Sequence, residues 1–144
     1  MTLREWKYED ILKISQLEKE IFSDEAWSYK TLATVFEMKN FLSLLCEDGG
    51  EIAGYGGVTV AADSADIGNI AVAEQYRNSG IGTAILQKLC EKAKERGAEK
   101  VFLEVRVSNS AAMKLYLKCG FVGAYARTRY YPDGEDCLVM AKKL

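Results

Sequence analysis

Residues 77–83 read Arg-Asn-Ser-Gly-Ile-Gly-Thr and lie between an apolar run, residues 67–72, and a segment with helical periodicity, residues 82–96. The order of strand, glycine turn and helix leaves free backbone amides at the first turn of the helix, where the helix dipole adds positive potential. The two glycines let the chain turn tightly and let a ligand approach the backbone. The stretch predicts either a phosphate-binding turn, to which Arg77 adds a charged contact, or an ordinary helix start.

Composition and charge indicate one globular domain over residues 1–144. Hydrophobic residues make up 49% of the chain and charged residues 28%, and the formal net charge is -2. A chain of this length builds one core of adequate size. The absence of a broad basic field argues against nucleic acid as the main ligand, and the apolar runs are too short to cross a bilayer. We therefore expect a cytoplasmic protein with neither nucleic acid nor a membrane as partner.

The histidine and cysteine content limits the catalytic mechanisms and the metal sites that this chain can form. The chain has no histidine, which excludes Ser-His-Asp and Cys-His catalysis and removes the commonest metal ligand. Its four cysteines are widely spaced and form no Cys-x-x-Cys pair, so zinc binding is not indicated and reduced thiols are expected. An enzyme built on this chain must use carboxylates, Tyr, Lys, Cys or backbone amides, with no metal.

Periodicity and turn residues predict an α/β fold of the α+β kind, a mixed sheet covered by helices. Helices are expected after the caps Asp10 and Ser28, over residues 82–96, and from a cap at Ser108 or Asn109 to Gly120. Strands are expected at residues 41–46, 51–61, 66–72, 100–107, 121–130 and 136–142, with one more left open in residues 1–8.

Several motifs, taken in the order in which they occur along the chain, resemble the GNAT superfamily of N-acetyltransferases. These enzymes transfer acetyl from acetyl-coenzyme A to an amine. The turn at residues 77–83, preceded by Ile-Ala-Val at 70–72, is similar to the acyl-CoA motif of that family. Residues 103–109, 115–116, 120–121 and 130–140 resemble the branch that acetylates protein N-termini, in particular bacterial ribosomal-protein-alanine N-acetyltransferases.

The resemblance implies a single GNAT-like domain with a central, mostly antiparallel and partly splayed sheet flanked by helices. Acetyl-CoA is the implied cosubstrate, and a splayed strand offers backbone groups to its thioester. The implied binding residues are Ile70, Ala71, Val72, Arg77, Asn78, Ser79, Gly80, Ile81, Gly82, Thr83 and Asn109.

The same resemblance implies two catalytic residues. Glu104 is the candidate base that takes a proton from the amine, directly or through a water, and Tyr116 is the candidate acid that protonates the departing thiolate. Each residue has a structural alternative: Glu104 faces solvent or pairs with Arg106 or a lysine, and Tyr116 is a core aromatic with its hydroxyl at the rim. Asn109 serves as a helix cap, as a contact to the cofactor, or as both.

Aromatic residues are the candidates for the acceptor site, with plain packing as the alternative. Trp27 lies in Ala-Trp-Ser, where relatives often have Pro-Trp-Ser, and Tyr130 and Tyr131 lie in the last hairpin. The acidic residues Asp24, Glu25, Glu135 and Asp136 are either solvated charges or steer a basic peptide.

The leading functional hypothesis is acetylation of the N-terminal α-amine of a protein, in particular a ribosomal protein that begins with a small residue such as alanine, by direct attack in a ternary complex. The chain would act as a monomer or weak homodimer. One alternative is a GNAT enzyme that acetylates a small-molecule amine or a lysine side chain. The other is a non-catalytic acyl-CoA-binding module.

Overall fold

A seven-stranded mixed sheet forms the centre of the computed structural model, which describes residues 1–144. The strand order is β1-β2-β3-β4-β5-β7-β6, and only β4 and β5 run parallel. The predicted fold class, a mostly antiparallel mixed sheet flanked by helices, is confirmed. The strands are β1 (Thr2–Arg4), β2 (Phe41–Asp48), β3 (Glu51–Ala61), β4 (Ser64–Val72), β5 (Lys100–Arg106), β6 (Val122–Arg127) and β7 (Cys137–Lys143).

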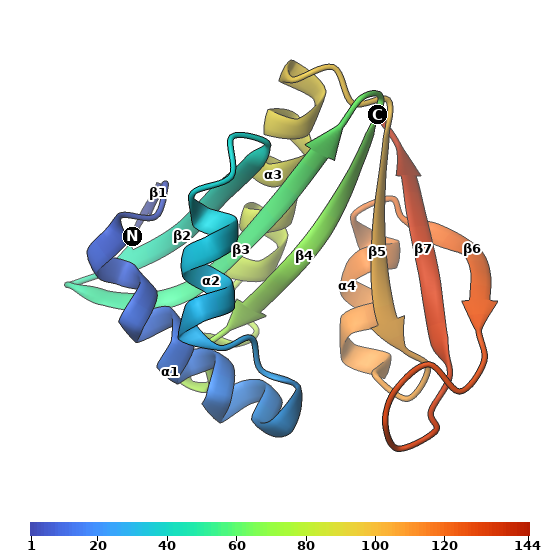
Figure 1. Ribbon diagram of the computed structural model, residues 1–144, viewed down its shortest axis with the longest axis horizontal. Helices are drawn as coiled ribbons and strands as arrows, with labels where there is room; N and C mark the ends of the chain where they lie inside the picture. Colours follow the sequence, from blue (N-terminus) through green and yellow to red (C-terminus); the bar gives the residue numbers. More distant parts are fainter.

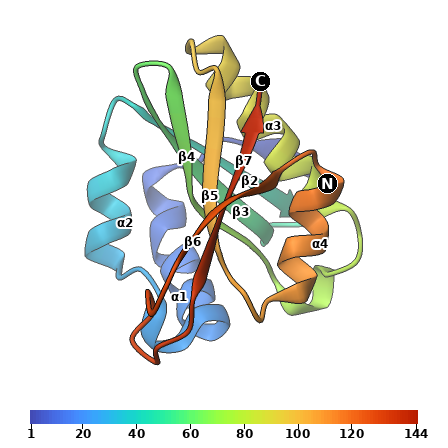
Figure 2. The ribbon, with the colours of Figure 1, turned by 90° about the vertical axis from the view of Figure 1, so that its right-hand side faces the viewer.

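Helices cover both faces of the sheet (Figures 1 and 2). The helices α1 (Ile11–Phe22) and α2 (Tyr29–Phe36) lie on one face, and α3 (Ile81–Glu95) and α4 (Ser110–Lys118) lie on the other. A cluster of 21 buried residues fills the α3 and α4 side, and a cluster of nine fills the α1 and α2 side. Because both faces are covered, Phe41–Cys46 of β2 is a continuous run of buried residues.

The sheet splits between β4 and β5. These strands pair only over Ser64–Asp66 and Lys100–Phe102, and beyond that point they diverge, so the two halves form a V that opens toward the bottom of Figure 1. Beyond the split, β4 carries a bulge at Gly68, because Ile67 pairs with Val58 and Asn69 pairs with the adjacent Gly57. The predicted splay is therefore present, and it exposes the second half of β4 along one edge.

The helix ends confirm most of the predicted caps. Ser28 accepts from the amide of Thr31, and Asn109 accepts from the amide of Ala112. Gly97 and Gly120 both take φ +95 just after a helix, a conformation that favours glycine. The strand predicted at residues 121–130 is shorter, because β6 ends at Arg127 and the chain then turns, with Arg129 at φ +51.

Asp10 is the N-cap residue of α1, as predicted, but its side chain accepts no hydrogen bond from the amides of α1. Its carboxylate instead accepts from the amide of Lys7, at 2.6 Å, and pairs with Arg4 Nη1 at 2.8 Å. Burial raises the pKa of Asp10, but the hydrogen bonds from Arg4 and Lys7 outweigh it and hold the pKa below its usual value. Asp10 thus ties the start of α1 to the first strand.

The four cysteines are free and buried. No helix of the structure combines the length and the apolar character that crossing a bilayer requires.

We expect Asp10→Asn to lower the free energy of unfolding by roughly 1.5–3 kcal/mol near neutral pH, because it breaks a largely buried charged hydrogen-bond pair. A carboxylate with a depressed pKa in the folded state contributes stability above its unfolded pKa of about 3.9 and loses it as the pH falls through the folded value. The difference from wild type should therefore shrink below about pH 4 in urea denaturation. Glu9→Gln, at an exposed neighbour, is the control; an unchanging difference down to about pH 2 would contradict the role given to Asp10.

Candidate active site

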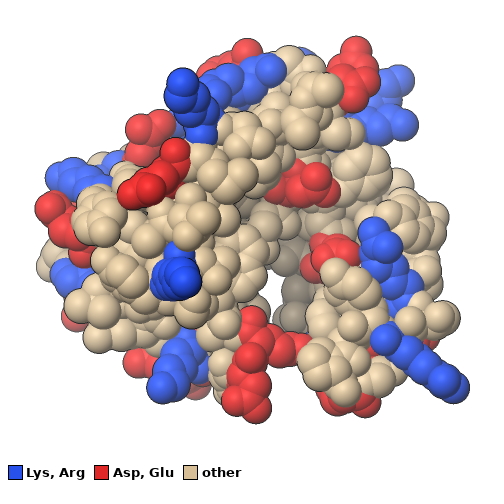
Figure 3. Space-filling model, viewed as in Figure 1, with Lys and Arg blue, Asp and Glu red and all other residues tan.

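Two cavities meet where β4 and β5 diverge, and Figure 3 shows the opening between the two halves of the molecule with acidic side chains around it. The larger arm, of about 870 Å³, runs between β4, the turn at residues 77–83 and α4, and the smaller arm, of about 620 Å³, runs between β4, β5 and the loop before β7. The two arms form one continuous cleft, because they share the lining residues Phe22, Glu25, Ile70, Arg106, Asn109 and Tyr116.

The turn at residues 77–83 presents free amides to the larger arm. Asn78 takes φ +62 and Gly80 φ +84, and the first helical hydrogen bond of α3 runs from the amide of Ala84 to the carbonyl of Gly80. None of the six amides from Asn78 to Thr83 donates to a backbone carbonyl. A row of free amides at a helix N-terminus is suited to a phosphate or pyrophosphate.

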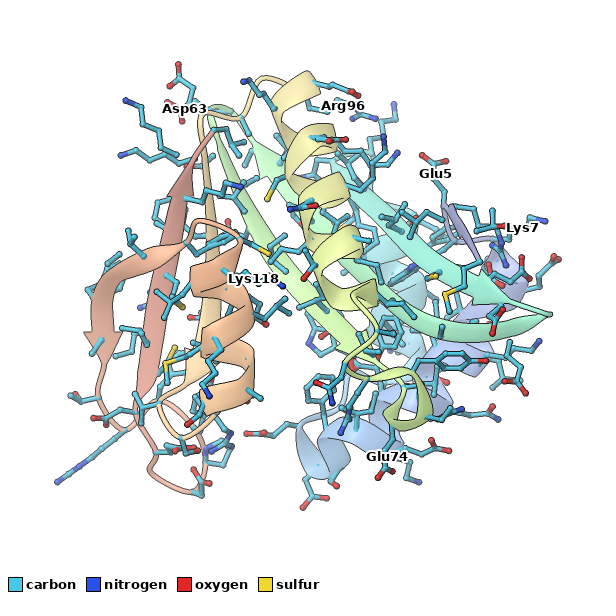
Figure 4. The ribbon with its side chains drawn as sticks, turned by 180° about the vertical axis from the view of Figure 1, so that it is seen from behind. Glu5, Lys7, Asp63, Glu74, Arg96 and Lys118 are labelled. Carbon is cyan, nitrogen blue, oxygen red and sulfur yellow. The ribbon has the colours of Figure 1, made fainter.

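The larger arm gathers ten of the eleven residues predicted to bind the cofactor. Ser79 is the exception, because it does not line the cavity and its hydroxyl donates to the carbonyl of Tyr76. Lys114 and Lys118 of α4 also line this arm, and Figure 4 shows Lys118 on the side of α4 that faces α3. These two lysines were not predicted, because helical spacing alone does not say which exposed lysines border a cavity.

The second half of β4 turns backbone groups toward the cleft. The amide of Ala73 donates to Ala53 of β3, and strand alternation then directs the amides of Val72 and Ile70 away from β3. Arg77 Nε donates to the carbonyl of Val72 at 3.2 Å, so this arginine also fastens the turn to the strand. Gly82 lies close to α4, since a Cβ at that position would lie 3.2 Å from Leu115 Cδ2.

Glu104 lies in the smaller arm, on the cleft face of β5. Its side chain points away from the face on which its neighbours Leu103 and Val105 are buried. Its carboxylate accepts from Tyr130 Oη at 3.1 Å and pairs with Arg127 Nε at 3.1 Å. The alternative prediction, that Glu104 forms an ion pair with Arg106, is wrong. The side chain is 40% exposed, so it is accessible to water in the cleft.

Tyr116 lies between the two arms and is 8% exposed. It comes from α4 and packs on Phe121, with 6.2 Å between the ring centroids. Burial raises the pKa of Tyr116 to about 12, so the phenol keeps its proton throughout the neutral range.

Aromatic side chains form the walls of the smaller arm, and the structure brings Trp27, Tyr130 and Tyr131 together there. The two tyrosines meet edge to face, with 5.2 Å between ring centroids. The Trp27 ring covers the bulge of β4 so closely that a Cβ at Gly68 would lie 2.9 Å from Trp27 Cη2.

Arg106 forms an ion-pair cluster at the open end of the cleft, which was not predicted from the sequence. Its guanidinium pairs with Glu25 after α1, with Asp133 at 2.9 Å and with Glu135 at 2.8 Å in the loop before β7, and lies 4.1 Å above the Tyr131 ring. Glu25 and Glu135 are thus ion-paired, and Asp136 accepts from the amide of Arg129. The only signal in the sequence was that Arg106 shares a strand face with Glu104.

Comparison with known proteins agrees with this geometry. The model of the acetyltransferase (GNAT) family matches residues 8–121. A ribosomal protein bS18-alanine N-acetyltransferase of Escherichia coli K12 is 39% identical over 118 residues, which cover 80% of this chain and 79% of the relative. An N-alpha-acetyltransferase of Sulfurisphaera tokodaii is 54% identical over 77 residues, 53% of this chain and 46% of the relative.

The crystal structure of the Escherichia coli ribosomal-protein-S18-alanine N-acetyltransferase superposes with a TM-score of 0.89 at 34% identity, covering 99% of this chain and 92% of that one. The resemblance inferred from the sequence motifs is thereby confirmed. The free amides of the turn, the split sheet and these matches together place the chain in the acetyltransferase (GNAT) family, as an N-acetyltransferase.

Proposed function

We propose that this protein transfers acetyl from acetyl-CoA to the N-terminal α-amine of a protein, with a ribosomal protein that begins with a small residue such as alanine as the acceptor. The observation that carries the proposal is the two-armed cleft, in which Tyr116 borders both arms and Glu104 lies in the smaller one. The names of the relatives from Escherichia coli and Sulfurisphaera tokodaii support the choice of acceptor.

The residues of the larger arm fit acetyl-CoA. The free amides of Asn78 and of residues 80–83, which line this arm, suit the pyrophosphate, and Arg77, Lys114 and Lys118 add positive charge beside them. Along β4, the residues proposed to follow the pantetheine arm are Ile70, Ala71 and Val72, with Asn109 opposite. When bound, acetyl-CoA supplies an activated acetyl thioester with a thiolate as leaving group.

The chain's own residues handle the protons. In the proposed reaction, Glu104 takes a proton from the incoming ammonium, directly or through a water, because only the free amine has a lone pair. Tyr116 holds the proton that neutralises the departing sulfur. The amide of Ile70, turned away from β3, donates to the acetyl oxygen.

The smaller arm is the proposed peptide site. Trp27, Tyr130 and Tyr131 form its walls, and the tight contact of Trp27 with Gly68 limits the space for the first side chain. With such an acceptor the reaction takes place in the cytoplasm, in a single domain of residues 1–144 that acts as a monomer or weak homodimer.

Acetyl transfer to a panel of peptides with free or blocked N-termini tests this proposal, with thiol release as the assay and mass spectrometry to locate the acetyl group. We expect acetylation of free α-amines only, fastest for peptides that begin with alanine or serine. Acetylation confined to lysine side chains or to polyamines would favour the alternative GNAT acceptor. Binding of acetyl-CoA without transfer to any amine would favour the non-catalytic module.

Tyr116→Phe should lower kcat roughly 100-fold or more, the usual contribution of a general acid, because phenylalanine keeps the packing on Phe121 but has no proton to give. The acetyl-CoA dissociation constant and the melting temperature should stay close to wild type. Steady-state kinetics and calorimetry measure these quantities. Turnover within about threefold of wild type would remove Tyr116 from the mechanism.

Glu104→Gln should lower kcat/KM roughly 100-fold, because the amide keeps a hydrogen-bond acceptor for Tyr130 but cannot take a proton. The matched control is Glu91→Gln on the exposed face of α3, which should leave kcat/KM unchanged. If Glu104→Gln also proves harmless, the amine loses its proton by another route and Glu104 only pairs with Arg127.

A further inference from the structure

Glu18 is a buried carboxylate that the proposed reaction does not use. It lies on α1 in line with Ile11 and Ile14, on the stripe that faces the sheet, and is 1% exposed. No ion pair includes it. Burying a carboxylate among apolar residues without a cation is unfavourable, so an apolar residue here would give a more stable helix.

The hydrogen-bond partner of Glu18 belongs to the wall of the smaller arm. Glu18 Oε1 accepts from the side-chain amide of Asn69, the residue that directly follows the Gly68 bulge and itself lines the arm. Burial raises the pKa of the Glu18 carboxyl, and the hydrogen bond from Asn69 offsets this only in part. The Trp27 ring packs against the same bulge, at Gly68, so Glu18 contacts the segment on which that ring lies.

The remaining atoms of the cluster leave the carboxylate without a second firm partner. Glu18 Oε2 and the hydroxyl of the fully buried Tyr55 make no hydrogen bond of ordinary geometry. The hydrogen bond from Asn69 is therefore the one through which Glu18 acts on its surroundings. It leads from behind the wall toward the cleft, because Asn69 lines the smaller arm and Glu18 does not.

We propose that Glu18 is a positioning residue for the acceptor peptide: its buried carboxylate holds Asn69 beside the Gly68 bulge on which the Trp27 ring packs, and so fixes the wall against which the first residue of the peptide lies. The inference rests on the proposed function for its substrate. It predicts a defect in peptide binding and not in acetyl-CoA binding, because the turn at residues 77–83 lies in the other arm.

Single substitutions distinguish the loss of the hydrogen bond between Glu18 and Asn69 from a general disturbance of α1. Glu18→Ala should raise the peptide KM at least tenfold, with kcat changed less than threefold and the acetyl-CoA dissociation constant within twofold. Glu18→Gln should stay within threefold of wild type, because its amide oxygen still accepts from Asn69. Glu20→Ala, at an exposed glutamate of the same helix, is the matched control and should behave as wild type.

An exchange of donor and acceptor tests the contact itself. Asn69→Asp places two carboxyl groups face to face and should raise the peptide KM as Glu18→Ala does. The double variant Glu18→Gln with Asn69→Asp should return to within threefold of wild type, because the glutamine amide then donates to the aspartate. A double variant no better than Asn69→Asp, or a loss of acetyl-CoA affinity equal to the loss for peptide, would overturn the positioning role.

A second measurement decides the inference even if the wild-type protein acetylates no peptide, a result that would refute the proposed function alone. Iodide quenching reports mainly on Trp27, since the other tryptophan, Trp6, is 4% exposed. Glu18→Ala should increase the quenchable fraction of the emission and Glu20→Ala should not. Equal quenching in wild type and Glu18→Ala would show that Glu18 does not hold the wall.

Discussion

The divergence of β4 from β5 is the constraint on which the rest of the structure depends. Backbone amides and carbonyls inside a protein need partners, and in a sheet the neighbouring strand supplies them. Beyond Asp66 and Phe102 that neighbour is missing, so the second half of β4 turns unpaired groups into a cleft. The same split separates the helices on either side and creates the two arms. The candidate site is therefore the place where the ladder of strand hydrogen bonds is interrupted.

The two halves of the sheet are joined differently at the two ends of the cleft. At the closed end, backbone hydrogen bonds join them, including one of 2.6 Å from the amide of Glu99 to the carbonyl of Asp63. At the open end they are joined by the ion pair of Arg106 with Glu25. Partly exposed ion pairs contribute little and are screened by salt. The cleft is thus firmly connected at its closed end and weakly connected at its open end.

Local features of this protein were predictable from the sequence, and long-range contacts were not. The caps Ser28 and Asn109, the free amides after Arg77 and the outward orientation of Glu104 follow from residues within one helical turn or one strand. The partner of the Asp10 carboxylate was not predictable, because Arg4 lies in a strand that the sequence left open. Glu18 stands in an apolar stripe, a local signal that something is unusual, but Asn69 is 51 residues away in the chain.

The surroundings of the two proposed catalytic groups fit the directions in which protons must move. Glu104 is 40% exposed and is held by Arg127, itself 46% exposed, so an ammonium can compete for the carboxylate against a weak ion pair. A proton taken up there has a short way to bulk water. Tyr116 is buried, and its pKa of about 12 keeps the phenol protonated until a basic group forms beside it. An exposed acceptor on β5 and a buried donor on α4, both lining one cleft, therefore give the proposed transfer its direction.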